Sequence, residues 1–131
     1  MNLFGDVLVV NEHDEILLLQ RALNGDFMPG AYWIPGGHIE MGENPRLGAI
    51  RELYEETTIA GDATYLETVI LPNDNGVSFR YGCHVAMPNV VIDNDESASY
   101  VWANLSELDD YPLVGSADEL VRLHELLDNI R

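Results

Sequence analysis

The sequence has no lysine, and its basic residues are all arginines. There are six of them against 23 acidic residues, which gives a formal net charge of −17 at pH 7. The absence of lysine excludes Schiff-base catalysis and a P-loop, because both need a lysine amine. So acidic a chain has no basic patch for duplex nucleic acid. An anionic small-molecule substrate would need metal ions and a few well-placed arginines.

The sequence also has a single cysteine and no apolar run that approaches membrane-spanning length. Cys83 excludes an intramolecular disulfide and a cysteine-based zinc site, and its apolar and aromatic neighbours predict a buried structural thiol. The N-terminus lacks a basic segment and Asp6 interrupts its apolar run, so no signal peptide is expected. We therefore expect a cytoplasmic protein without membrane contact. The strong acidity without lysine leads to the hypothesis that the protein works in a high-salt environment.

With 131 residues and 47% hydrophobic residues, the chain is long enough for one domain, residues 1–131, with a real core. Apolar, β-branched and aromatic segments predict strands, and apolar spacing near 3.6 residues predicts helices. Strands are expected at 3–10, 15–21, 32–34, 65–71, 77–87 and 100–102, with hairpins joining the first two and the 65–71 and 77–87 pair. Helices are expected from residue 45 to about 57 and at 117–130, with His124 on the surface side of the second.

The first helix is the most informative segment. Asn44 suits an N-cap and Pro45 the first helical position. An apolar stripe is predicted to pack on a sheet: Leu47, Ile50, Leu53, Tyr54 and Thr57. Three carboxylates share another face, with Arg51 one turn before Glu55 and able to pair with it: Glu52, Glu55 and Glu56. Such carboxylates suit Mg²⁺ or Mn²⁺, but a solvated acidic surface is the alternative interpretation of the helix alone.

The segment from Gly37 to Ile59 adds the pattern that separates these interpretations. It resembles the Nudix box, G-x5-E-x7-R-E-U-x-E-E-x-G-U with U apolar, and matches eight of its nine fixed positions over 23 residues. The matching residues are Gly37, Glu43, Arg51, Glu52, Leu53, Glu55, Glu56 and Ile59. Thr58 departs from the usual glycine where the helix ends, a position that binds no metal, so the departure concerns the local turn.

The resemblance implies an α/β Nudix fold, a mixed β-sheet sandwiched between helices, and a metal-dependent hydrolase. Mg²⁺, or alternatively Mn²⁺, would be held by Glu52, Glu55 and Glu56 with the carbonyl of Gly36 or Gly37, while Glu43 and Arg51 would orient these ligands. In the acidic loop at 89–99, Glu96 is the candidate for a fourth metal ligand or the general base. The base that deprotonates the attacking water is either a helix glutamate, with Glu52 first, or Glu96.

The resemblance further implies water attack on phosphorus in a nucleoside diphosphate linked to another group. The aromatic hairpin after the box resembles that of nucleoside triphosphate pyrophosphohydrolases, so a (deoxy)nucleoside triphosphate is the expected substrate. The alternatives are a nucleotide sugar, ADP-ribose or a dinucleoside polyphosphate, or a non-catalytic nucleotide sensor. Some relatives are homodimers. Candidate substrate contacts, each with a structural or surface role as its alternative, are Arg21, Phe79, Arg80, Tyr81 and His84.

Overall fold

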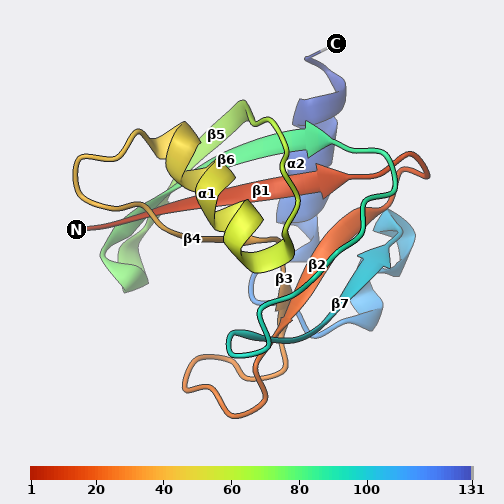
Figure 1. Cartoon of the computed structure of the whole chain (residues 1–131), viewed down its shortest axis with the longest axis horizontal. Helices are drawn as coiled ribbons and strands as arrows, with labels where there is room; N and C mark the ends of the chain where they lie inside the picture. Colours follow the sequence, from red (N-terminus) through yellow and green to blue (C-terminus); the bar gives the residue numbers. More distant parts are fainter. Residues whose placement is uncertain (131) are drawn as a thin grey trace.

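A seven-stranded mixed sheet forms the centre of the protein, and two α-helices lie on it (Figure 1). The structure is a computed structural model that describes residues 1–130. The strands are β1 (Asn2–Val10), β2 (Ile16–Arg21), β3 (Tyr32–Trp33), β4 (Gly36–His38), β5 (Thr64–Leu71), β6 (Gly76–His84) and β7 (Ser97–Ala103). The helices are α1 (Pro45–Thr57) and α2 (Ala117–Asp128), with 3₁₀ turns η1 (Pro72–Asp74) and η2 (Leu105–Asp110).

The sheet runs in the order β3-β2-β1-β6-β5, with β4 added on β1 and β7 on β2. β1 and β6 are parallel over the full length of β1, and the other pairs are antiparallel. The predicted hairpins are both present. β1 pairs with β2 only where Val10 lies opposite Ile16, because β4 pairs with the other end of β1, at residues 4–6. The Gly36-Gly37 segment therefore lies where β1 and β2 diverge.

The two faces of the sheet bury separate cores, because successive strand residues point to opposite sides. Val7 and Val9 pack with Leu53 of α1, whereas Leu8 and Val10 pack with Leu123 of α2. The predicted α/β arrangement, a mixed sheet between helices, is confirmed. No helix among residues 1–130 is long and apolar enough to cross a membrane.

The face of α1 that packs on the sheet differs from the predicted apolar stripe. Leu47 and Tyr54 are 56% and 55% exposed, so these two assignments were wrong. The buried positions of the helix are Gly48, Ala49, Leu53, Glu56 and Thr57. Close approach explains the difference: a Cβ placed on Gly5 would lie only 3.0 Å from the Cβ of Ala49. The helix thus turns its small residues, and Glu56 with them, toward the sheet.

Other expectations about the second half of the chain need correction. β6 ends at His84, before the predicted limit, and β7 begins at Ser97, inside the predicted acidic loop, because it pairs along β2. His124 was predicted to be on the surface, but it is only 6% exposed. Its Nε2 lies 2.7 Å from the carboxylate of Asp14 in the β1–β2 turn, a contact distant in sequence. Cys83 is buried, as predicted.

Candidate active site

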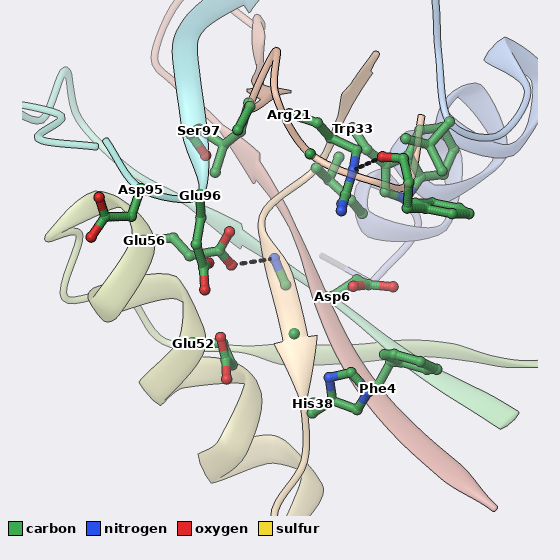
Figure 2. Close-up of a pocket in the computed structure, with 18 of the residues that line it drawn as sticks. Phe4, Asp6, Arg21, Trp33, His38, Glu52, Glu56, Asp95, Glu96 and Ser97 are labelled. Carbon is green, nitrogen blue, oxygen red and sulfur yellow. Dashed lines mark hydrogen bonds between the residues drawn. The ribbon is translucent and has the colours of Figure 1, made fainter. Parts of the chain in front are cut away.

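A cleft of about 650 Å³ opens where β1 and β2 diverge (Figure 2). Its walls come from β1, the end of β2, β4, helix α1 and the start of β7. The segment around β4 forms its middle, with Gly36, Gly37 and His38 among the lining residues. Two helix glutamates, Glu52 and Glu56, line it from α1. The cleft therefore brings the predicted glycine turn and part of the acidic helix face together.

The two glycines of β4 are needed for space rather than for an unusual backbone angle. A Cβ at Gly37 would collide with the Glu52 carboxylate, and one at Gly36 would collide with the Asp6 carboxylate. The backbone N–H of Gly36 donates a hydrogen bond to Glu56 Oε1 at 2.9 Å. Only residues without a side chain let β4 approach carboxylates on both sides so closely.

Arg51 organises the acids at the edge of the cleft. Its Nε and Nη2 donate to the two oxygens of Glu43 at 2.8 and 3.0 Å, a fork that only arginine can supply. Its Nη1 donates to Glu52 at 3.0 Å and to Glu55 at 3.1 Å, which confirms the predicted pairing with Glu55. The bonds from Arg51 lower the pKa of Glu43 to about 2. Arg51 thus fixes three carboxylates on one cation.

Glu56 is a strongly perturbed acid of the cleft. Burial raises its pKa to about 8, against the opposing hydrogen bond from Gly36, and nearby Glu52, Glu96 and Asp6 raise it further. Burial likewise raises the pKa of Glu52 and of Asp6. These acids therefore repel each other in a partly desolvated site, where both protonation and a cation relieve the repulsion.

This donor set fits a hard divalent cation, since carboxylate oxygens are its preferred ligands. The raised pKa of Glu56, caused in part by three neighbouring acids, marks a site short of positive charge. Among residues 1–130, no three His, Cys, Asp or Glu side chains converge closely enough to hold an ion as they stand. Binding would therefore need side-chain rotations that bring carboxylates such as Glu52, Glu56 and Glu96 together.

The remaining predicted acids occupy different places. Glu96 lines the cleft beside Glu56, close enough for its charge to raise the pKa of Glu52 and Glu56 (Figure 2). Glu55 is outside the cleft, on the side of α1 where it bonds Arg51, with 55% of its side chain exposed. Glu43 also lies behind the cleft, near the start of α1. In this arrangement Glu52, Glu56 and Glu96 face the space where a substrate would lie, and Glu55 faces Arg51.

Arg21 is at the end of β2 and lines the opposite part of the cleft. Its Nε donates to the Phe27 carbonyl at 2.8 Å, and its guanidinium lies over the Phe27 ring, 5.0 Å from the centroid. Phe27 comes from the loop between β2 and β3 and also lines the cleft. This position leaves the arginine at the cleft, as its predicted contact with substrate requires.

The four candidate contacts on β6 lie elsewhere: Phe79, Arg80, Tyr81 and His84 are not among the residues that line the cleft. Tyr81 is in the core beneath α1, with Phe79 packed against that core. Arg80 is 4% exposed and its Nη1 lies 2.9 Å from Glu119 of α2. These positions fit structural roles for Phe79, Arg80 and Tyr81, and His84 is exposed at the end of β6, which fits a surface role.

The cleft includes residues that the sequence did not single out as site residues. Asp6, Phe4, Trp33 and His38 line it, and the rings of Phe4 and His38 lie 4.6 Å apart. Asp6 had one detectable signal, a lone acid within the apolar run of the first strand. The aromatic residues had no such signal, because their position at the cleft depends on how β1, β3 and β4 assemble.

Residues 5–124 match the NUDIX domain family, and the chain therefore belongs to the Nudix family. "Nudix hydrolase 8" of Arabidopsis thaliana is 25% identical over 92% of this chain and 34% of its own length. The "8-oxo-dGTP diphosphatase" of Escherichia coli is 42% identical over 40% of this chain and 40% of its own. The matched segments thus span well under half the length of these two relatives.

Solved structures share the fold along nearly the whole chain. The NUDIX domain of Shewanella oneidensis NrtR, complexed with ADP ribose, superposes with a TM-score of 0.79 at 22% identity, covering 98% of this chain and 88% of that one. The MutT protein of Methanosarcina mazei gives a TM-score of 0.77 at 22% identity over 99% of this chain and 95% of that one. At this identity the likeness establishes the Nudix fold, and the substrate has to be argued from the cleft.

Proposed function

We propose that this protein is a metal-dependent pyrophosphohydrolase that cleaves a (deoxy)nucleoside triphosphate to a monophosphate and pyrophosphate. One observation carries the proposal: three carboxylates, Glu52, Glu56 and Glu96, face one cleft beside a glycine strand. Arg51 ties the first of them to Glu43 and Glu55 behind the cleft. A solvated acidic surface would require neither the glycines nor the arginine fork.

Mg²⁺ is the proposed cofactor, with Mn²⁺ as the alternative, held by Glu52, Glu56 and Glu96 with a carbonyl of Gly36 or Gly37. When bound, the ion would neutralise phosphate charge and lower the pKa of the attacking water. Glu55 was also proposed as a ligand from the sequence, and it could serve only after it leaves Arg51. Its present contact supports a role in fixing Arg51, with Glu43, rather than in binding the ion directly.

The proposed base remains one of two carboxylates at the cleft. Burial raises the pKa of Glu52, but the hydrogen bond that it accepts from Arg51 opposes protonation and holds the carboxylate in one orientation. Glu96 makes no side-chain hydrogen bond to another residue within the described part of the chain, so its carboxylate is free to accept a proton from water. These contacts favour Glu96 as the base and Glu52 as a ligand that Arg51 orients.

The substrate assignment is supported by the two ends of the cleft. Carboxylates occupy one end, where metal-bound phosphates would lie, and Trp33 and Phe27 with Arg21 occupy another, where a base would find apolar and cationic surface. The E. coli relative is named for a nucleoside triphosphate substrate. A nucleotide sugar, ADP-ribose or a dinucleoside polyphosphate is the alternative substrate. The S. oneidensis structure is a complex with ADP ribose, so these compounds belong in the substrate panel.

The test is product analysis across a substrate panel with Mg²⁺ or Mn²⁺. The panel holds ordinary and oxidised nucleoside triphosphates, ADP-ribose, nucleotide sugars and dinucleoside polyphosphates, each repeated with Glu56→Gln. We expect pyrophosphate from a triphosphate, and at least a 100-fold loss of turnover in the variant, on the order of the loss when a key electrostatic group is removed. Turnover of another class alone would refute the substrate. Binding without turnover of any compound would favour a nucleotide sensor over an enzyme.

A further inference from the structure

The strand β4 divides the cleft into two parts (Figure 2). On one side lie Glu52, Glu56 and Glu96, and on the other lies Asp6, near Phe4. Gly36 separates the two parts: its N–H bonds Glu56, while its Cα faces the Asp6 carboxylate. Asp6 is therefore an acid of the cleft that stands apart from the proposed metal ligands and belongs to the part lined by aromatic side chains.

The carboxylate of Asp6 is held in one orientation from behind. The Ser78 hydroxyl donates to its Oδ2 at 2.7 Å. The Nε of Arg80 donates to the same hydroxyl at 3.3 Å, and Arg80 is itself fixed by Glu119 at 2.9 Å. Ser78 and Arg80 are both buried, at 0% and 4% exposure, so the surrounding fold encloses this support. Ordered polar groups behind a site are what selective recognition needs, because they fix the side chain that meets the ligand.

The other carboxylate oxygen, Oδ1, is directed over Gly36 into space that only a glycine leaves open. Asp6 lines the cleft, and Oδ1 is the oxygen that Ser78 leaves unbonded. Burial raises the pKa of Asp6, whereas the Ser78 hydroxyl and the nearby Arg80 charge favour its ionised form. In that form the carboxylate has no hydrogen to donate, so it recognises a ligand only through the ligand's own N–H or O–H groups. It also disfavours an acceptor in the same place, since two acceptors with no hydrogen between them repel each other.

We propose that Asp6 is a specificity residue that accepts hydrogen bonds from the N–H groups of a nucleobase bound beside Phe4 and Trp33. The inference rests on the proposed function, since it places the phosphates on the acidic side of β4 and the base on the other. Ser78 and Arg80 are positioning residues that act through Asp6. Arg80, predicted from the sequence as a direct substrate contact, is thus connected to the cleft through two side chains.

The chemistry of Asp6 selects among the bases. Guanine presents two neighbouring N–H donors, on N1 and on the 2-amino group, and both can point at Oδ1, because one carboxylate oxygen has two lone pairs. Adenine and cytosine place an acceptor nitrogen beside their amino group, and uracil flanks its single N–H with two carbonyls. A rigid carboxylate therefore favours guanine, or a modified purine with the same edge, and discriminates against the others through unpaired acceptors.

The test measures binding of nucleoside monophosphates by calorimetry with Mg²⁺, so that no hydrolysis is needed. GMP, IMP and AMP are compared, because IMP keeps the N1 hydrogen of guanine and lacks only the 2-amino group. Wild-type protein should bind GMP about 10–100-fold more tightly than AMP, with IMP between them, as expected for hydrogen bonds to a charged group. Asp6→Asn should reduce this preference to a few fold or less. The exposed acid of α2 supplies a matched control, Asp118→Asn, which should keep the wild-type preference.

Ser78→Ala is the second variant, since it keeps the Asp6 charge and removes only the hydroxyl that orients it. It should reduce the GMP preference in the same direction, and thermal unfolding will check that both variants fold. Equal weakening of all three nucleotides in Asp6→Asn, or a higher Mg²⁺ requirement with unchanged base preference, would overturn the proposal and make Asp6 a ribose, phosphate or metal contact. Hydrolysis with no base preference would refute this role of Asp6 alone. A base preference without hydrolysis would refute the proposed activity alone.

Discussion

Thr58 offers the cleanest test of how the Nudix box ends in this chain. The family places glycine at this position, and the structure explains why: Thr58 has φ 61° and ψ 12°, the left-handed conformation that caps α1. Its N–H donates to the Tyr54 carbonyl at 2.8 Å, so the conformation is part of the helix end and cannot relax without losing that bond. Thr58→Gly should therefore relieve strain without altering the fold.

The size of the gain follows from two opposing effects. The left-handed conformation costs an L-residue about 1–2 kcal/mol, and threonine is β-branched, so the upper half of that range applies. The substitution also costs about 0.4–1 kcal/mol of stability, because glycine increases the conformational entropy of the unfolded chain that folding must remove. The exposed hydroxyl also loses its bond to the Thr57 carbonyl. The net stabilisation should be about 0.5–1 kcal/mol, which is an increase of roughly 2–4 °C in Tm for a domain of this size.

The assay is thermal unfolding followed by circular dichroism or calorimetry at fixed pH and salt. Thr64→Gly is the matched control, because Thr64 is exposed at the start of β5, in extended backbone. The control should lose about 0.5–1 kcal/mol, the usual cost of glycine in a strand. If Thr58→Gly lowers Tm by as much as the control does, the strain argument is wrong and the Thr58 side chain stabilises the turn.

Three further predictions concern the acids and their partners. Since the pKa of Glu56 is raised from 4.5 to about 8, the folded protein holds a proton that the unfolded chain has released across this window. Stability without divalent ions should therefore fall by a few kcal/mol at most as pH rises from 4.5 to 8, and Glu56→Gln should flatten Tm against pH in EDTA. Mg²⁺ or Mn²⁺ should raise Tm at pH 8 in the wild type but not in Glu56→Gln. An equal increase in Tm in the variant would show that the ion binds without Glu56. Arg51→Lys should lower kcat about 10–100-fold, because lysine lacks both the fork that holds Glu43 and the further N–H groups that hold Glu52 and Glu55. Arg46→Lys, at a surface pair with Asp62, should leave kcat unchanged. Because the net charge is −17, molar KCl should raise Tm by screening the repulsion between acidic side chains. If Tm does not rise, the hypothesis of a high-salt environment is wrong.

The sequence by itself determined most local features. The spacing of Gly37, Glu43 and the helix acids predicted the family, and short-range rules predicted the Asn44 cap and the Arg51–Glu55 pair. The Asn44 side chain accepts from Arg46 and Leu47 N–H, as an N-cap does. These features depend on residues within one or two turns of each other, so the chain order is enough to predict them.

Tertiary structure decided which residues meet at the cleft. Leu53 and Thr57 of α1 are buried as predicted, but Leu47 and Tyr54 were assigned wrongly, because the close approach of Ala49 to Gly5, far apart in the chain, sets the rotation of the helix. His124 was mispredicted for the same kind of reason, since its partner Asp14 is 110 positions away.

Asp6 and Arg80 show this limit most clearly. Each appears in the sequence as a single charge in a strand, and the sequence gives no register between β1 and β6. The parallel pairing of these strands places Asp6 opposite Arg80, with Ser78 joining their side chains. Register is set by burial and sheet order across the whole domain, so only the folded chain reveals that these residues form one support beneath the cleft.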